Sequence, residues 1–134
     1  MLNIVNQKTG WIEVICGSMF SGKTEELIRR IRRAEYAKQK VLVFKPVIDN
    51  RYDANNIVSH SQMQAPSIPI NAPGEIYSYL DDDVKIIAID EAQFFDDQLP
   101  YVCETLANSG TRVIVAGLDM DYLGKPFGPM PLEI

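Results

Sequence analysis

The sequence predicts an α/β fold in which a parallel sheet is flanked by helices. Four short apolar runs rich in β-branched residues recur along the 134 residues, and stretches with helical periodicity separate them. Each run is continuously hydrophobic and bounded by turn or charged residues, which is typical of strands that are buried on both faces of a parallel sheet. No internal repeat or low-complexity linker interrupts this alternation.

The elements follow one another in a simple order. The predicted strands are WIEVI at 11–15, KVLVF at 40–44, KIIAID at 85–90 and RVIVAG at 112–117. The predicted helices cover residues 23–38, about 74–81 and about 96–109. Between the second strand and the second helix, residues 46–73 contain three prolines before Pro73 and few periodic apolar positions. We therefore expect a long irregular excursion there, of the kind that is often functional or mobile.

The helix predicted at residues 23–38 is amphipathic. At 100° per residue, one side carries the apolar residues Leu27, Ile28, Ile31 and Ala34, and the other side carries Arg29, Arg30, Arg32 and Arg33. The simplest interpretation of the arginines is a solvated outer face. A contact with nucleic acid or with another subunit is the alternative.

Composition limits the classes of protein that the chain can belong to. Its length and its 46% hydrophobic and 23% charged residues predict one globular domain over residues 1–134, and the net charge of −5 opposes a nucleic-acid partner. Cys16, Cys103 and His60 make neither a disulfide framework nor a zinc site. Since no signal peptide or membrane span is evident, we expect a cytoplasmic, reduced protein without a membrane partner.

The sequence GSMFSGKT matches the pattern G-x-x-x-x-G-K-[ST], between a predicted strand and a predicted helix. The glycines let successive backbone N–H groups and the helix N-terminus face a phosphate chain. Lys23 can reach the β- and γ-phosphates, and the Thr24 hydroxyl can bind Mg²⁺. The loop predicted to bind phosphate consists of Gly17, Ser18, Met19, Phe20, Ser21, Gly22, Lys23 and Thr24. The sequence thus predicts a P-loop NTPase-like fold.

The sequence KIIAIDE supplies a second part of such a site. Its apolar residues bring Asp90 to the end of a buried strand, where the carboxylate can hold Mg²⁺ together with Thr24. Glu91 follows directly, and because successive strand residues point to opposite sides, we expect it to face a substrate hydroxyl or water. These residues predict a Mg-nucleotide triphosphatase or kinase and leave the acceptor open.

Four stretches carry a resemblance to a known family: GSMFSGKTEELIRRIRRAEYA, VFKPVIDNRY, IAIDEAQFFDD and VIVAGLDMDYLGKPFGP. Together they resemble the thymidine kinases of the cellular, zinc-containing type (type II), over about residues 11–131. The resemblance implies transfer of the ATP γ-phosphoryl group to the 5′-hydroxyl of thymidine, with Mg²⁺ accompanying ATP. It also implies a homotetramer.

The resemblance implies roles for individual residues. Glu91 resembles the proton acceptor for the 5′-hydroxyl, and Asp90 the carboxylate on the metal side. The ATP site implied by the family extends beyond the loop at residues 17–24 to Asp49, Asn50, Arg51, Asp90, Glu91, Ala92 and Gln93. A turn is the alternative interpretation of residues 49–51, because Asp-Asn is favourable turn chemistry.

The family's thymine pocket is aromatic and apolar. The residues at matching positions are Met19, Phe94, Leu118, Tyr122 and Phe127. Burial in the core is the alternative for Phe94 and Leu118. Tyr122 replaces the phenylalanine that is usual in the family, and its hydroxyl needs a partner or water.

Family members continue past KPFGP into a small lobe with four zinc ligands, and none of these ligands is in this chain, which stops at Ile134. We therefore expect a fragment, or the ordered part, of a longer chain with a structural zinc. Two other functions remain open from the residues: a nucleic-acid-dependent ATPase of the recombinase type, suggested by the arginine face, and a nucleotide-binding regulatory module without catalysis.

Overall fold

A five-stranded parallel sheet forms the centre of the computed structural model, which describes residues 10–17, 22–47, 55–59 and 63–117. The strands are β1 (Trp11–Cys16), β2 (Lys40–Pro46), β5 (Ile68–Ile70), β6 (Val84–Ile89) and β7 (Arg112–Gly117). Their order in the sheet is β1-β7-β6-β2-β5, and every neighbouring pair is parallel. The predicted α/β class with a P-loop NTPase-like parallel sheet is confirmed.

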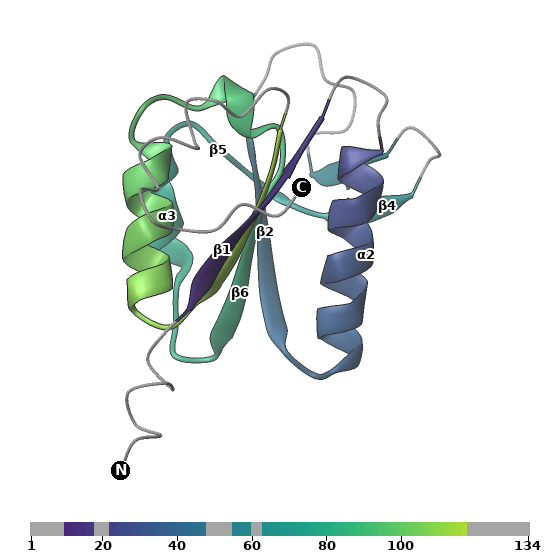
Figure 1. Ribbon diagram of the computed structural model, residues 1–134, viewed down its shortest axis with the longest axis horizontal. Helices are drawn as coiled ribbons and strands as arrows, with labels where there is room; N and C mark the ends of the chain where they lie inside the picture. Colours follow the sequence, from purple (N-terminus) through teal and green to yellow (C-terminus); the bar gives the residue numbers. More distant parts are fainter. Residues whose placement is uncertain (1–9, 18–21, 48–54, 60–62, 118–134) are drawn as a thin grey trace.

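Helices cover both faces of this sheet (Figure 1). The helix α2 (Lys23–Tyr36) packs on one face through Leu27, Ile28, Ile31 and Ala34, as its periodicity predicts. The helix α3 (Leu99–Asn108) and the 3₁₀ helix η1 (Pro73–Tyr79) pack on the other. Across the described ranges, no helix combines the length and the apolar character that crossing a membrane requires.

Strand alternation determines which side chains lie under α2. In β1, Ile12 and Val14 belong to the core on the α3 face, whereas Ile15 belongs to the core beneath α2. Glu13 lies between Ile12 and Val14, so it points to the α2 face. The carboxyl end of β6 follows the same rule, because Ile86 and Ala88 lie beneath α2 and Asp90 continues their series. The α2 face therefore carries the polar chemistry of the sheet.

The excursion expected at residues 46–73 contains regular structure, so that expectation was wrong for its described part. The strands β3 (Asn56–Val58) and β4 (Gln64–Pro66) form an antiparallel pair, and β5 extends the main sheet. These strands have only three residues each, which is too short for a periodic pattern to show. Pro69 is tolerated in β5 because this strand is at the edge of the described sheet.

The second predicted helix is a 3₁₀ helix, η1, and it begins and ends close to the expected residues. Its start is held by Glu75, whose carboxylate accepts hydrogen bonds from the backbone N–H groups of Asn71 and Ala72, each at 3.0 Å. Pro73 occupies the first turn, where a missing N–H is harmless. The other two helices end within three residues of their predicted bounds.

Candidate active site

The start of α2 forms one side of the site, at the carboxyl end of β1. Gly22 precedes the helix with φ of 89°, a left-handed conformation that glycine adopts without the steric penalty of a side chain. Its carbonyl accepts the first helical hydrogen bond, from the N–H of Glu26 at 2.9 Å. Lys23 and Thr24 are the first residues of the helix, and the N–H groups and dipole of a helix N-terminus favour an anion.

Asp90 forms the opposite side of the site, directly after β6. Its backbone N–H donates to the carbonyl of Phe44 in β2 at 2.9 Å, which holds the residue at the carboxyl edge of the sheet. The Thr24 hydroxyl donates to the Asp90 carboxylate, with Oγ1 to Oδ2 and Oδ1 distances of 3.1 and 3.4 Å. The structure thus brings together two residues that are 66 positions apart in the sequence.

The environment of Asp90 disfavours its charge. The residue is only 4% exposed, and this burial, together with the charge of Glu91, raises its pKa to about 6. The hydrogen bond from Thr24 and the charge of Lys23 oppose the increase. A divalent cation beside the carboxylate would favour the ionised form.

The donor set of Thr24 and Asp90 suits magnesium. A hydroxyl and a carboxylate oxygen are hard ligands, and Mg²⁺ commonly takes one or two protein oxygens and completes its shell with water and substrate phosphates. Within the described part of the chain, no group of three or more His, Cys, Asp or Glu side chains is placed to hold a metal. The site as described therefore fits a metal that arrives with a nucleotide.

Glu91 begins a turn rather than ending a strand. It has φ of 54° and ψ of 40°, which is a left-handed conformation. Among the other described non-glycine residues, only Lys38 also has a positive φ. This turn, and not strand alternation, decides where the side chain points. Glu91 Oε1 accepts a hydrogen bond from Gln93 Nε2 at 3.0 Å. Strained backbone of this kind is concentrated at functional sites.

The residues after Glu91 separate into buried and exposed ones. Ala92 is fully buried and Phe95 is 7% exposed, whereas the Phe94 ring is 54% exposed. The interpretation of Phe94 as a core residue was therefore wrong, and Phe95 has the core position instead. Ala92 is covered as a whole residue, and its place in the implied ATP site stays a prediction.

Several expected site residues lie outside the described residues. They are Ser18, Met19, Phe20 and Ser21 of the loop, Asp49, Asn50 and Arg51 of the implied nucleotide contact, and Leu118, Tyr122 and Phe127 of the implied thymine pocket. Gly17, at the end of β1, and Gly22, Lys23 and Thr24, at the start of α2, are described and bracket the loop.

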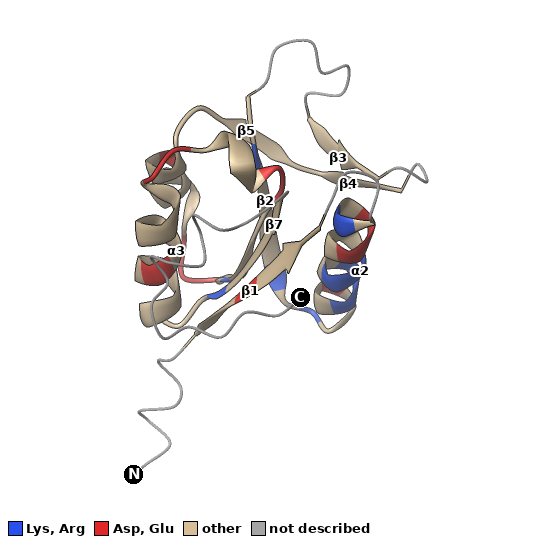
Figure 2. Cartoon of the chain, turned by 45° about the horizontal axis from the view of Figure 1, so that its top comes forward, with Lys and Arg blue, Asp and Glu red and all other residues tan. Residues whose placement is uncertain are grey.

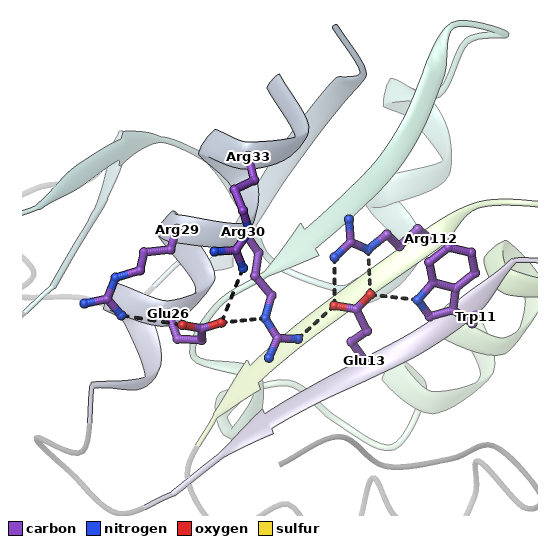
Figure 3. Close-up of polar contacts among 7 residues, drawn as sticks. All are labelled: Trp11, Glu13, Glu26, Arg29, Arg30, Arg33 and Arg112. Carbon is purple, nitrogen blue, oxygen red and sulfur yellow. Dashed lines mark hydrogen bonds and ion pairs between the residues drawn. The ribbon is translucent and has the colours of Figure 1, made fainter. Parts of the chain in front are cut away.

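An ion cluster around the buried carboxylate of Glu13, beneath α2, was not predicted (Figure 3). Glu13 is 5% exposed, and its carboxylate accepts hydrogen bonds from Trp11 in β1, Arg30 in α2 and Arg112 in β7. Arg30 also donates to Glu26 at 2.8 Å. We call Trp11, Glu13, Glu26, Arg30 and Arg112 the Glu13 cluster. A charged residue inside an otherwise apolar strand is the sequence signal that marks it.

The arginine face of α2 is not the uniform solvated face that the helical pattern suggested. Arg30 belongs to the Glu13 cluster, and its side chain is only 17% exposed. Arg29 pairs with Glu25 and Glu26, and Arg33 pairs with Glu26. Figure 2 shows acidic and basic residues together along this helix. Three of the four arginines of this face thus pair with carboxylates of the protein, and Arg32 donates to the carbonyl of Gln64, which weakens the case for a nucleic-acid contact.

The sequence model of the thymidine kinase family matches residues 10–132 of the chain. The match covers most of the 134 residues and includes the loop, both carboxylates and the Glu13 cluster.

Proposed function

We propose, because the chain belongs to the thymidine kinase family, that it transfers the γ-phosphoryl group of ATP to the 5′-hydroxyl of thymidine. One observation carries the proposal most directly: Thr24, at the start of α2, donates a hydrogen bond to Asp90, at the end of β6. In a P-loop kinase these two positions belong to the residues that hold the metal of the Mg-nucleotide.

The start of α2 would bind the phosphates. Gly22 turns the chain into the helix whose first N–H groups would bind an anion, and the Lys23 ammonium would add a positive charge. Thr24 and Asp90 would hold Mg²⁺, which supplies charge neutralisation at the β- and γ-phosphates when it is bound. Catalysis then consists mainly of positioning and electrostatic stabilisation.

Glu91 would be the general base. Its carboxylate accepts the proton of the 5′-hydroxyl as the hydroxyl oxygen bonds to the γ-phosphorus and the bond from that phosphorus to the β–γ bridging oxygen breaks. The hydrogen bond from Gln93 to one carboxylate oxygen helps to orient the Glu91 side chain. The exposed ring of Phe94 would provide an apolar contact for the thymine base, close to Glu91 in the chain.

The family resemblance supports further parts of the proposal. We propose a homotetramer in the cytoplasm, with ATP and thymidine as its small-molecule substrates and neither nucleic acid nor membrane as a partner. The resemblance also implies a structural zinc, whose ligands are not among the residues of this sequence. The paired arginines of α2 support the absence of a nucleic-acid partner.

The test is formation of ADP and thymidine monophosphate from MgATP with thymidine, with single-stranded DNA and with neither. We expect turnover that depends on thymidine and that Lys23→Ala largely abolishes, because the variant lacks the charge at the transferring phosphate. ADP formation that depends on DNA would indicate the recombinase-type alternative. Nucleotide binding without turnover under all three conditions would indicate a regulatory module.

A further inference from the structure

The Glu13 cluster connects α2 to β1 and β7, the two strands beneath it (Figure 3). Arg112 in β7 donates through Nε and Nη2 to the two oxygens of Glu13, at 2.6 and 3.0 Å. Trp11 Nε1 and Arg30 Nη1 donate to the same carboxylate at 2.7 and 2.8 Å. The carboxylate therefore accepts four hydrogen bonds, which is about its full capacity.

The cluster continues along α2 toward the phosphate-binding residues. Arg30 uses its Nε to bind Glu26 at 2.8 Å, while its Nη1 binds Glu13. The backbone N–H of Glu26 closes the first turn of the helix on Gly22. Thr24 is in this same turn. One guanidinium thus joins the sheet to the turn that carries the proposed phosphate and metal contacts.

Apolar packing alone does not fix a helix as strictly as this cluster does. The core beneath α2 consists of Leu27, Ile28, Ile31 and Ala34 against small and β-branched strand residues. Such contacts are non-directional, so small sliding or rotation of the helix loses little energy. A guanidinium bound to carboxylates on both sides has strict geometry. Binding sites need their groups held within about 0.5 Å of the productive geometry.

We propose that Glu13 and Arg30 are positioning residues that set the place of α2 on the sheet, and thereby hold Lys23 and Thr24 for the nucleotide phosphates. The proposal rests on the proposed function, in which these two residues bind the Mg-nucleotide. Neither Glu13 nor Arg30 touches the nucleotide in this proposal. They act through the helix.

The chain offers a closely matched pair of variants. Arg30→Met removes the connection between α2 and the sheet, while Glu13 keeps its partners Arg112 and Trp11, so its buried charge retains two partners. Arg29→Met is the control, because Arg29 is on the same helix and, among the described residues, binds only Glu25 and Glu26 of that helix. Both substitutions remove one arginine and add the same apolar side chain.

The measurement is the affinity for MgADP by calorimetric titration, at a temperature where circular dichroism shows each variant folded. We expect Arg30→Met to weaken MgADP binding by about 10-fold, a common scale for loss of a supporting contact around a site. Arg29→Met should remain within about twofold of wild type. At that temperature nearly all of each variant is folded, so loss of stability alone would leave the apparent dissociation constant nearly unchanged.

Two further variants make the result decisive. Arg30→Lys keeps the charge but lacks the forked guanidinium that binds both glutamates, so we expect an intermediate loss of MgADP affinity. It replaces Arg30→Met in the comparison if Arg30→Met does not fold. Adding Glu13→Gln to Arg30→Met should cause little further loss of MgADP affinity, because both residues act through one connection. An MgADP affinity of Arg30→Met, or of Arg30→Lys in its place, equal to that of Arg29→Met would overturn the inference. Failure of the wild type to bind MgADP would instead contradict the proposed function.

Trp11 provides an independent readout, because it is the only tryptophan of the chain and donates to Glu13. The Arg112 guanidinium also lies over its ring, 5.9 Å from the centroid. If α2 and the cluster are coupled, MgADP should change the tryptophan emission of the wild type and change it less in Arg30→Met. An MgADP-induced change of the same size in both proteins would count against the coupling.

Discussion

At the scale of single residues, Asp90 shows how a site can oppose the stability of its own fold. The carboxylate is nearly fully buried, and it has a pKa of about 6 because of that burial and of the neighbouring charge of Glu91. Its ordinary value is 3.8. Above about pH 6 the folded protein therefore holds a charge that it disfavours, which is useful where a metal is to be bound.

We predict that Asp90→Asn stabilises the folded protein at pH 7.5 by up to about 3 kcal/mol, from about 1.4 kcal/mol for each unit of the pKa increase. The stabilisation should decline from about pH 6 and become small by about pH 3, where Asp90 is mostly protonated in both the folded and the unfolded state. Urea unfolding at the two pH values measures this. MgADP binding should be lost in the same variant. A variant less stable than wild type at pH 7.5 would contradict the role of burial.

Glu91 permits a second prediction at this scale. Glu91→Gln should lower kcat by about 100-fold, the usual scale for a general base, and leave the affinity for MgADP unchanged. Gln keeps the size of the side chain and an oxygen that can accept the hydrogen bond from Gln93. Steady-state kinetics with thymidine and calorimetry with MgADP separate the two effects. A parallel loss of nucleotide affinity would make Glu91 a metal ligand instead.

At the scale of elements, the junction between β1 and α2 depends on one backbone conformation. Gly22 has φ of 89°, and a Cβ placed on it would meet no atom within 4 Å. A side chain there would therefore cause backbone strain alone. The turn also delivers the first N–H groups of α2 to the proposed phosphate site, so strain and binding are linked at this residue.

We predict that Gly22→Ala lowers the free energy of unfolding by about 1–2 kcal/mol, the cost of a left-handed conformation for a residue with a side chain. It should also weaken MgADP binding. Gly74→Ala is the matched control, because Gly74 has equally free space and no left-handed φ. Chemical denaturation of both variants tests this. Equal stability of the two variants would show that the backbone at position 22 relaxes to another conformation in Gly22→Ala.

At the scale of the whole molecule, the Glu13 cluster joins an edge strand, an inner strand and a helix. Burial raises the pKa of Glu13, but hydrogen bonds from Arg112, Trp11 and Arg30 lower it more, so the net pKa is below its ordinary value of 4.5. A carboxylate of this kind stabilises the fold above its ordinary pKa. The stabilisation is lost as pH falls through the pKa of the folded state.

We predict that Glu13→Gln destabilises the protein by about 3 kcal/mol at neutral pH, because its arginine partners are left without their buried counter-charge. The difference from wild type should shrink as the pH falls below the ordinary pKa of 4.5 and through the lowered pKa of the folded state, because Glu13 then becomes protonated in both states. Thermal unfolding from neutral to acidic pH measures this difference in stability. Glu25→Gln is the control, because Glu25 belongs to a more exposed ion pair, for which we expect only a small effect. A difference that stays constant with pH would exclude the charge of Glu13 as its cause.

The sequence by itself determined the α/β class, the four longer strands and the positions of α2 and α3. It could do so because these elements are long enough for their periodicity to show and because a strand buried on both faces has a continuous apolar run. It also predicted the start of α2 and Asp90 as parts of one site, because the loop pattern is typical of sites that bind phosphate and Mg²⁺. The described geometry agrees with that pairing of Thr24 and Asp90.

Only the tertiary structure decided the rest. Strands of three residues, such as β5, show no period, and they form because a neighbouring strand already exists to pair with. The left-handed turn at Glu91 and the exposure of Phe94 depend on where β6 stops and which ring fills the core. Arg30 and Arg112 lie 82 positions apart in the chain and meet at one carboxylate because α2 crosses β1 and β7 on a single face. Sequence periodicity reports which side of an element faces inward. Which residues an inward-facing side chain contacts is decided only when the sheet is assembled.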